Sequence, residues 1–110
     1  MDDLLKNAKE FLESGEENIK NKRYNAAASD FFKAIVILCD YLIYNEIKIL
    51  PKNHNERFLL LKRYFIDIHD GVSKLFKVYV DSYNLRLNLE DALKIKSYAY
   101  GLKKYTEIKK

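Results

Sequence analysis

The sequence contains few residues that favour turns, with only three glycines and one proline among 110 residues. Such a chain has little material for hairpins or a β-sandwich, and the scarcity favours long helices. A single cysteine, Cys39, excludes an internal disulfide, and we interpret it as a small core residue in a reducing compartment. The two histidines, His54 and His69, lie far apart in sequence, so no metal site is predicted. We find no cofactor motif and expect no cofactor.

Long hydrophobic runs are also missing. The longest apolar run, residues 34–39, is far shorter than a membrane span. The first residues, Met-Asp-Asp-Leu-Leu-Lys, are acidic and lack the basic and apolar regions of a signal peptide. We therefore expect a cytoplasmic protein that does not enter a membrane. Its net charge of +4 permits an anionic partner such as RNA, yet falls short of the dense basic face of a dedicated nucleic-acid-binding protein.

The feature that the sequence does contain is an unusually apolar segment, residues 24–44. A chain of 110 residues with 48% hydrophobic residues is expected to fold as one domain, residues 1–110. Within the segment and just after it, apolar residues follow two stripes at helical spacing, so the helix must be covered on both sides. This predicts a long second helix at the centre of an all-α bundle, with one stripe packed inside the protomer and the other against another helix or a dimer mate. The stripes are Tyr24, Ala28, Phe31, Ile35, Leu38, Leu42 and Phe32, Val36, Cys39, Ile43, Ile47.

Start and stop signals divide the rest of the chain into helices. The pattern predicts a first helix over residues 2–19 and the central helix over residues 24–49, which ends before Pro51. Asn53 is the expected cap of a short third helix, since Glu56 follows three residues later. Asp70-Gly71 is expected to break or bend this helix, and a fourth helix is expected from about Val72. The segment 88–91, Asn-Leu-Glu-Asp, predicts the start of the last helix.

Four groups of residues spread over most of the chain form a recognisable pattern. They are Tyr24-x-x-Ala27-Ala28-Ser29-x-Phe31-Phe32-Lys33-Ala34, Pro51-Lys-x-His54, Leu75-x-x-x-Tyr79-x-Asp81-x-Tyr83 and Leu89-Glu-Asp-Ala92. In this order they resemble the HEPN superfamily, the higher eukaryotes and prokaryotes nucleotide-binding domain, in its small prokaryotic and archaeal form. The resemblance implies an up-and-down bundle of four to five helices that usually forms a homodimer. Many members are ribonucleases of toxin–antitoxin or defence systems, others are inactive, and some pair with a nucleotidyltransferase encoded beside them.

Catalytic members of the family carry an arginine and a histidine separated by four to six residues, which act on the scissile phosphate and the ribose 2′-hydroxyl. Arg63 and His69 have this spacing, with five residues between them. However, Tyr64 follows the arginine where active members usually have a smaller polar residue. The resemblance also places the family's segment at residues 77–84, which contain no such pair. The competing interpretation makes Arg63 a solvated residue and His69 a helix-end residue.

Four further residues are candidates for contacts to a nucleotide or RNA: His54, Tyr79, Asp81 and Tyr83. Tyrosines can stack on bases, as aromatic residues do for single-stranded RNA, although they more often bury their rings in a core or an interface. For His54 the alternative to a phosphate or base contact is a polar turn residue near a helix start, and this is the interpretation we favour. Basic residues near the C-terminus form either an ordinary solvated face or a stripe that faces RNA. These are Lys94, Lys96, Lys103, Lys104, Lys109 and Lys110.

These observations leave three functions, of which the first is favoured. It is a non-catalytic, dimeric binding module that engages a partner protein, a nucleotide or RNA, as in toxin–antitoxin or nucleotidyltransferase-associated systems. The second is a metal-independent endoribonuclease that uses Arg63 and His69. The third is a purely structural helical interaction domain.

Overall fold

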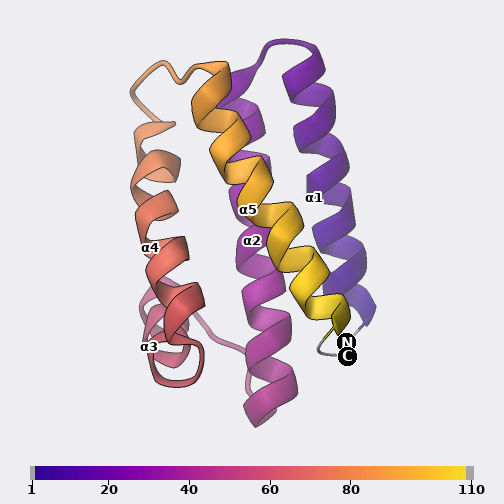
Figure 1. Cartoon of the computed structure of the whole chain (residues 1–110), viewed down its shortest axis with the longest axis vertical. Coiled ribbons are helices and arrows are strands. Elements are labelled where there is room, and N and C mark those ends of the chain that lie inside the picture. Colours follow the sequence, from indigo (N-terminus) through magenta and orange to yellow (C-terminus); the bar gives the residue numbers. More distant parts are fainter. Residues whose placement is uncertain (1, 109–110) are drawn as a thin grey trace.

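Residues 2–108 are described by the computed structural model, and over that range the chain forms five helices and no strand (Figure 1). Helices α1, α2, α4 and α5 run alternately up and down, and the short α3 lies beside one end of α4 (Figure 1). The predicted all-α bundle is therefore confirmed. The helices are α1 (Asp2–Lys20), α2 (Tyr24–Ile47), α3 (His54–Tyr64), α4 (Ile66–Asp81) and α5 (Leu89–Ile108).

Helix α2, with 24 residues, contacts each of the other helices. Its two apolar stripes face different neighbours. Phe31 lies against Gly15 of α1 and 6.4 Å, between ring centroids, from Tyr100 of α5. Phe32 instead contacts the aromatic rings of α4. Both phenylalanines are at most 1% exposed, so residues of a single chain cover both stripes.

The α1–α2 pair packs closely because Gly15 has no side chain. A Cβ at Gly15 would lie 2.6 Å from the Phe31 ring, closer than real contacts allow. The reversal between the helices places Lys22 in the left-handed region, with φ of 59°. Helix α1 extends to Lys20, one residue beyond the predicted end.

The predicted end of the central helix, residue 49, is wrong by two residues. Helix α2 stops at Ile47 because Lys48 adopts a left-handed conformation, with φ of 59°, and its N–H donates to the Tyr44 carbonyl. The predicted cap of α3 is confirmed, since the Asn53 side chain accepts a hydrogen bond of 2.9 Å from the Glu56 N–H.

The break predicted at Asp70-Gly71 is also wrong. The chain breaks at Phe65, with φ of −143° and ψ of 64°, and Gly71 lies inside α4, which begins at Ile66 rather than near Val72. Gly71 leaves room for the ring of Tyr98 from α5, because a Cβ there would lie 2.7 Å from its Cε2 atom. This glycine is therefore a packing residue and not a helix breaker.

The connection between α4 and α5 is tied to the start of α2. The Asn25 amide donates to the carbonyls of Ser82 and Leu85, at 2.8 and 2.6 Å, and accepts from the N–H of Leu87 at 2.9 Å. The start of α5 is a reciprocal capping box. The Asn88 side chain accepts from the Asp91 N–H at 2.9 Å, and the Asp91 carboxylate accepts from the Asn88 N–H at 3.1 Å. The predicted start signal of the last helix is confirmed.

Candidate binding pocket

A cavity of about 430 Å³ opens where α1, α2, α3 and α4 meet the turn that precedes α3. We call it the aromatic–basic pocket, because rings and cationic side chains share its lining. Its volume lies within the range of small-molecule sites. The lining residues are Phe11, Phe32, Lys33, Val36, Ile37, Lys52, Asn53, His54, Arg57 and Tyr79.

The aromatic wall of the pocket is built by α2 and α4. The rings of Phe32 and Tyr79 stack with their centroids 4.6 Å apart and their planes 13° apart. The Tyr79 hydroxyl is hydrogen-bonded to the hydroxyl of Tyr83 at 2.8 Å. This bond, together with burial, raises the pKa of Tyr79 to about 12. Tyr79 therefore presents a neutral, oriented ring at physiological pH.

Two lysines at the pocket have no carboxylate partner among residues 2–108. The Lys33 ammonium lies 5.6 Å from the centroid of the Phe11 ring, a cation–π contact, and Lys52 is exposed in the turn before α3. The salt bridges within the described residues include neither lysine. Both ammonium groups are thus available to an anion.

A chain of three polar side chains, two of which line the pocket, joins α2 to α3. Arg57, 8% exposed, binds the Asp40 carboxylate through two hydrogen bonds, Nε to Oδ1 at 2.6 Å and Nη2 to Oδ2 at 2.9 Å. Its remaining Nη1 lies 2.9 Å from Nδ1 of His54. Burial, followed by the positive charge of Arg57, lowers the pKa of His54, whereas Asp40 opposes the shift. The histidine is therefore neutral at pH 7.

The structure brings together two of the four residues that the sequence suggested for binding. His54 and Tyr79, 25 positions apart, both line the aromatic–basic pocket. Tyr83 contacts Tyr79 but is 74% exposed and lies outside the lining. Asp81 is paired with Lys77 at 3.4 Å, one turn away in α4, and does not line the pocket.

Sequence reasoning missed Phe11, Lys33, Lys52 and Arg57 as pocket residues. One usable signal was present, because Arg57 follows His54 by three residues and so lies on the same face of α3. The polar residue Asp40 inside the most apolar segment of the chain was a second signal, since a buried charge requires a partner.

Arg63 and His69 lie on different helices, at the end of α3 and in α4. The guanidinium carbon of Arg63 lies 5.5 Å from the centroid of the neighbouring Tyr64 ring. Nδ1 of His69 lies 3.0 Å from a carboxylate oxygen of Asp70, and its ring meets Phe58 edge-on. Neither Arg63 nor His69 lines the aromatic–basic pocket or the α4–α5 groove described next.

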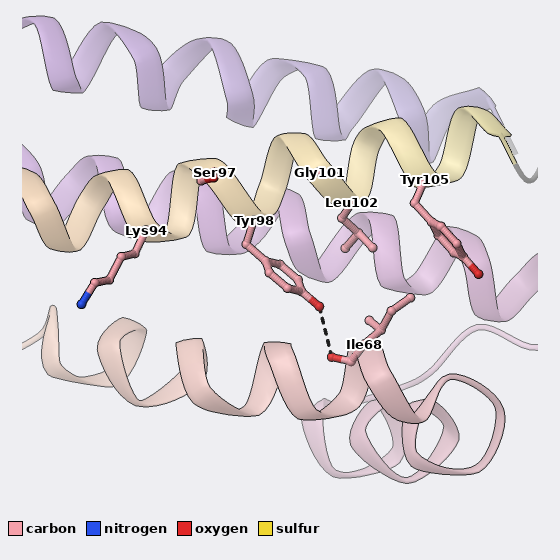
Figure 2. A pocket seen from close by; sticks show the side chains of 7 residues that line it. All are labelled: Ile68, Lys94, Ser97, Tyr98, Gly101, Leu102 and Tyr105. Carbon is pink, nitrogen blue, oxygen red and sulfur yellow. Dashed lines mark hydrogen bonds between the residues drawn. The ribbon is translucent and has the colours of Figure 1, made fainter.

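A larger, more apolar hollow of about 570 Å³ lies between α4 and α5, and we call it the α4–α5 groove (Figure 2). The Tyr98 hydroxyl donates across it to the Ile68 carbonyl at 3.4 Å, and burial raises the pKa of Tyr98 to about 12 (Figure 2). The groove has a single cationic side chain, so it suits an apolar surface better than a phosphate. Its lining is Ile68, Lys94, Ser97, Tyr98, Gly101, Leu102 and Tyr105.

The basic residues near the C-terminus do not form a continuous free stripe in the described part of the chain. Lys96 pairs with Glu16 of α1 at 2.7 Å, and Lys103 pairs with Glu107 at 3.6 Å. Lys109 and Lys110 lie outside the described residues.

A comparison with protein families identifies the fold that carries these features. The model of the HEPN domain matches residues 1–108 of the chain. The chain therefore belongs to the HEPN family, as its sequence motifs indicated. Searches of curated proteins and of solved structures each found no match. Within residues 2–108, no helix combines the length and the apolarity needed to cross a lipid bilayer.

Proposed function

We propose that this HEPN domain is a non-catalytic binding module that holds a nucleotide, free or as part of RNA, in the aromatic–basic pocket. One observation carries the proposal: two lysines without carboxylate partners, Lys33 and Lys52, line the same cavity as the rings of Phe11 and Tyr79. Lysine binds phosphate as a point charge, and aromatic rings bind bases through their faces and edges. The arrangement therefore matches both halves of a nucleotide.

The size of the pocket and the charges elsewhere favour a single nucleotide unit over an extended RNA track. A cavity of about 430 Å³ is suited to one small ligand. Lys96 and Lys103, the candidates for a longer basic stripe, are each paired with a glutamate. Lysines without a carboxylate partner thus line the pocket, whereas two of the lysines on α5 are neutralised by glutamates.

Calorimetric titration of the purified protein with AMP, UMP and a short single-stranded RNA tests this proposal. Lys33→Ala and Lys52→Ala should each weaken binding about five- to tenfold, since a charge-assisted contact near solvent contributes about 1 kcal/mol. Lys20→Ala is the matched control, because Lys20 is an exposed lysine at the end of α1 and should leave affinity unchanged. No binding, or an equal loss in all three variants, would refute the proposal.

The same module is proposed to act as a homodimer through the α4–α5 groove. Tyr64 and Ile66, which lie in an adjoining hollow that shares Ile68 with the groove, are 40% and 50% exposed. Asp67 in this hollow and Lys94 in the groove carry opposite charges. In a two-fold dimer these charges would pair across the interface, because the same patch meets itself in reverse.

Sedimentation equilibrium measures the homodimer directly. Ile66→Asp should shift the protein to the monomer, whereas Leu59→Asp, which changes a 69% exposed leucine outside the groove, should not. A monomer in the unsubstituted protein would exclude the homodimer. The groove would then be assigned to a partner protein, such as the nucleotidyltransferase that accompanies some HEPN proteins.

The spacing of Arg63 and His69 supports a second candidate function, a metal-independent endoribonuclease. Incubation with single-stranded RNA in the absence of metal tests it. Cleavage that disappears in His69→Ala would establish the enzyme and overturn the non-catalytic proposal. Absence of both cleavage and ligand binding would leave the purely structural interaction domain.

A further inference from the structure

The chain Asp40–Arg57–His54 restricts the chemical state of the histidine in the aromatic–basic pocket. The guanidinium of Arg57 remains protonated at all physiological pH values and can only donate hydrogen bonds. Its Nη1 lies 2.9 Å from Nδ1 of His54, so this ring nitrogen must accept the hydrogen bond and carry no proton. The single ring proton of neutral His54 therefore resides on Nε2.

Asp40 explains why Arg57 keeps this orientation. Two hydrogen bonds of 2.6 and 2.9 Å fix the guanidinium plane against the Asp40 carboxylate, and both side chains are largely buried, at 10% and 15% exposure. The fork geometry leaves Nη1 directed at the histidine. His54 is exposed, but one edge of its ring contacts Phe76 of α4, with the two ring centroids 5.4 Å apart.

We infer that Asp40 and Arg57 are positioning residues that hold His54 as a neutral Nε2–H donor for an anionic oxygen in the aromatic–basic pocket. The ligand part of this inference rests on the proposed function, while the state of the histidine does not. A phosphate oxygen is the matching acceptor, because Lys33 and Lys52 line the same cavity. In this proposal the ligand meets two point charges, Lys33 and Lys52, and one N–H donor, His54.

The groups around His54 agree with a neutral ring. Arg57 on its own helix contributes a positive charge beside Nδ1, and Lys52 precedes it in the turn. From α2, the negative charge of Asp40 opposes the lowering of the His54 pKa, and Lys33 lines the same cavity. Helix α4 contributes the neutral rings of Phe76 and Tyr79. Protonation of His54 would place a second donor against Arg57 and break their hydrogen bond.

The second histidine provides an internal reference with the opposite expectation. Nδ1 of His69 lies 3.0 Å from a carboxylate oxygen of Asp70, which accepts hydrogen bonds. Nδ1 of His69 must therefore carry a proton, whereas Nδ1 of His54 must not. The two histidines should differ in a single measurement on one sample.

Long-range ¹H–¹⁵N NMR of the full chain at pH 7 reads this difference, with the His54→Asn variant used to assign the signals. We expect a pyridine-like Nδ1 and a protonated Nε2 for His54, and a protonated Nδ1 for His69. Titration with inorganic phosphate and with AMP should shift the His54 signals more than those of His69. A protonated Nδ1 in His54, or a rapid tautomer mixture, would overturn the inference even if the protein binds nucleotides.

The double variant Asp40→Leu/Arg57→Met tests whether Asp40 and Arg57 position His54 or only stabilise the fold. It removes both charges and so avoids an unpaired buried ion. In this folded double variant the His54 tautomer should become mixed, and affinity for AMP should fall about fivefold. An unchanged tautomer would refute the positioning role. If His54 keeps the expected state but no phosphate or AMP binds, the proposed function and the ligand part of the inference fail, and the positioning of His54 stands.

Discussion

Replacing Arg57 by methionine should lower the free energy of unfolding by about 3 kcal/mol, because it leaves the Asp40 carboxylate without its partner in a largely buried site. The substitution keeps the length of the side chain but removes both hydrogen bonds to Asp40 and the contact with His54. Breaking such a pair costs 3–5 kcal/mol when it is fully buried, and the 15% exposure of Asp40 places this one near the lower bound. That loss is a large share of the 5–15 kcal/mol that stabilises a typical domain.

Urea denaturation followed by circular dichroism at pH 7 measures the effect. Asp40→Leu/Arg57→Met should lie within about 1 kcal/mol of the unsubstituted protein, so adding Asp40→Leu to Arg57→Met should recover about 2 kcal/mol of the lost stability. Arg63→Met is the matched control, since Arg63 is exposed and lies outside the pocket, and it should change stability by less than about 0.5 kcal/mol. Equal effects of Arg57→Met and Arg63→Met would refute the reasoning.

Two further predictions concern packing and pH. Gly15→Ala should destabilise the fold by about 1–2 kcal/mol, because its Cβ would lie 2.6 Å from the buried Phe31 ring. Gly101→Ala should instead stabilise the fold by about 0.5–1 kcal/mol, because the new Cβ would meet no neighbouring atom within 4 Å. Thermal denaturation of both variants checks the opposite signs, and equal shifts would contradict the packing role of Gly15. The pKa of His54 lies below its ordinary value of 6.5 in the folded chain, so the unfolded chain takes up protons first and stability should fall as the pH drops below about 6.5. The His54→Asn variant should lose this part of the pH dependence, and an unchanged profile between pH 5 and 7 would count against it.

Features that depend on neighbouring residues were predictable from the sequence. The apolar stripes of residues 24–44 specified a helix covered on two sides, and Phe31 and Phe32 are indeed buried against different helices. The caps Asn53 and Asn88 were recognised correctly, because a capping side chain bonds to the backbone three residues away. Helical spacing and capping bonds both involve residues only three or four positions apart.

The errors arose where a distant residue decides the local structure. Glycine often breaks helices, yet Gly71 lies inside α4. The ring of Tyr98, 27 residues later, occupies the space that a side chain at position 71 would need. The break falls at Phe65 instead, a residue with no turn propensity of its own.

The pocket shows the same division. Local pattern identified His54 and Tyr79 as separate candidates, but nothing in their spacing indicated that they share a cavity with Lys33. The partnership of Asp40 with Arg57 joins residues 17 positions apart on two helices, and it also determines which nitrogen of His54 holds the proton.

Backbone hydrogen bonds and helical periodicity operate over three or four residues, so the helices and their caps could be read directly from the chain. The pocket arises from the packing of α1, α2, α3 and α4, and its charges act across the short distances that this packing creates. The residues that line the pocket come together, and the tautomer of His54 is set, only when the helices pack. These properties are therefore decided by the tertiary structure.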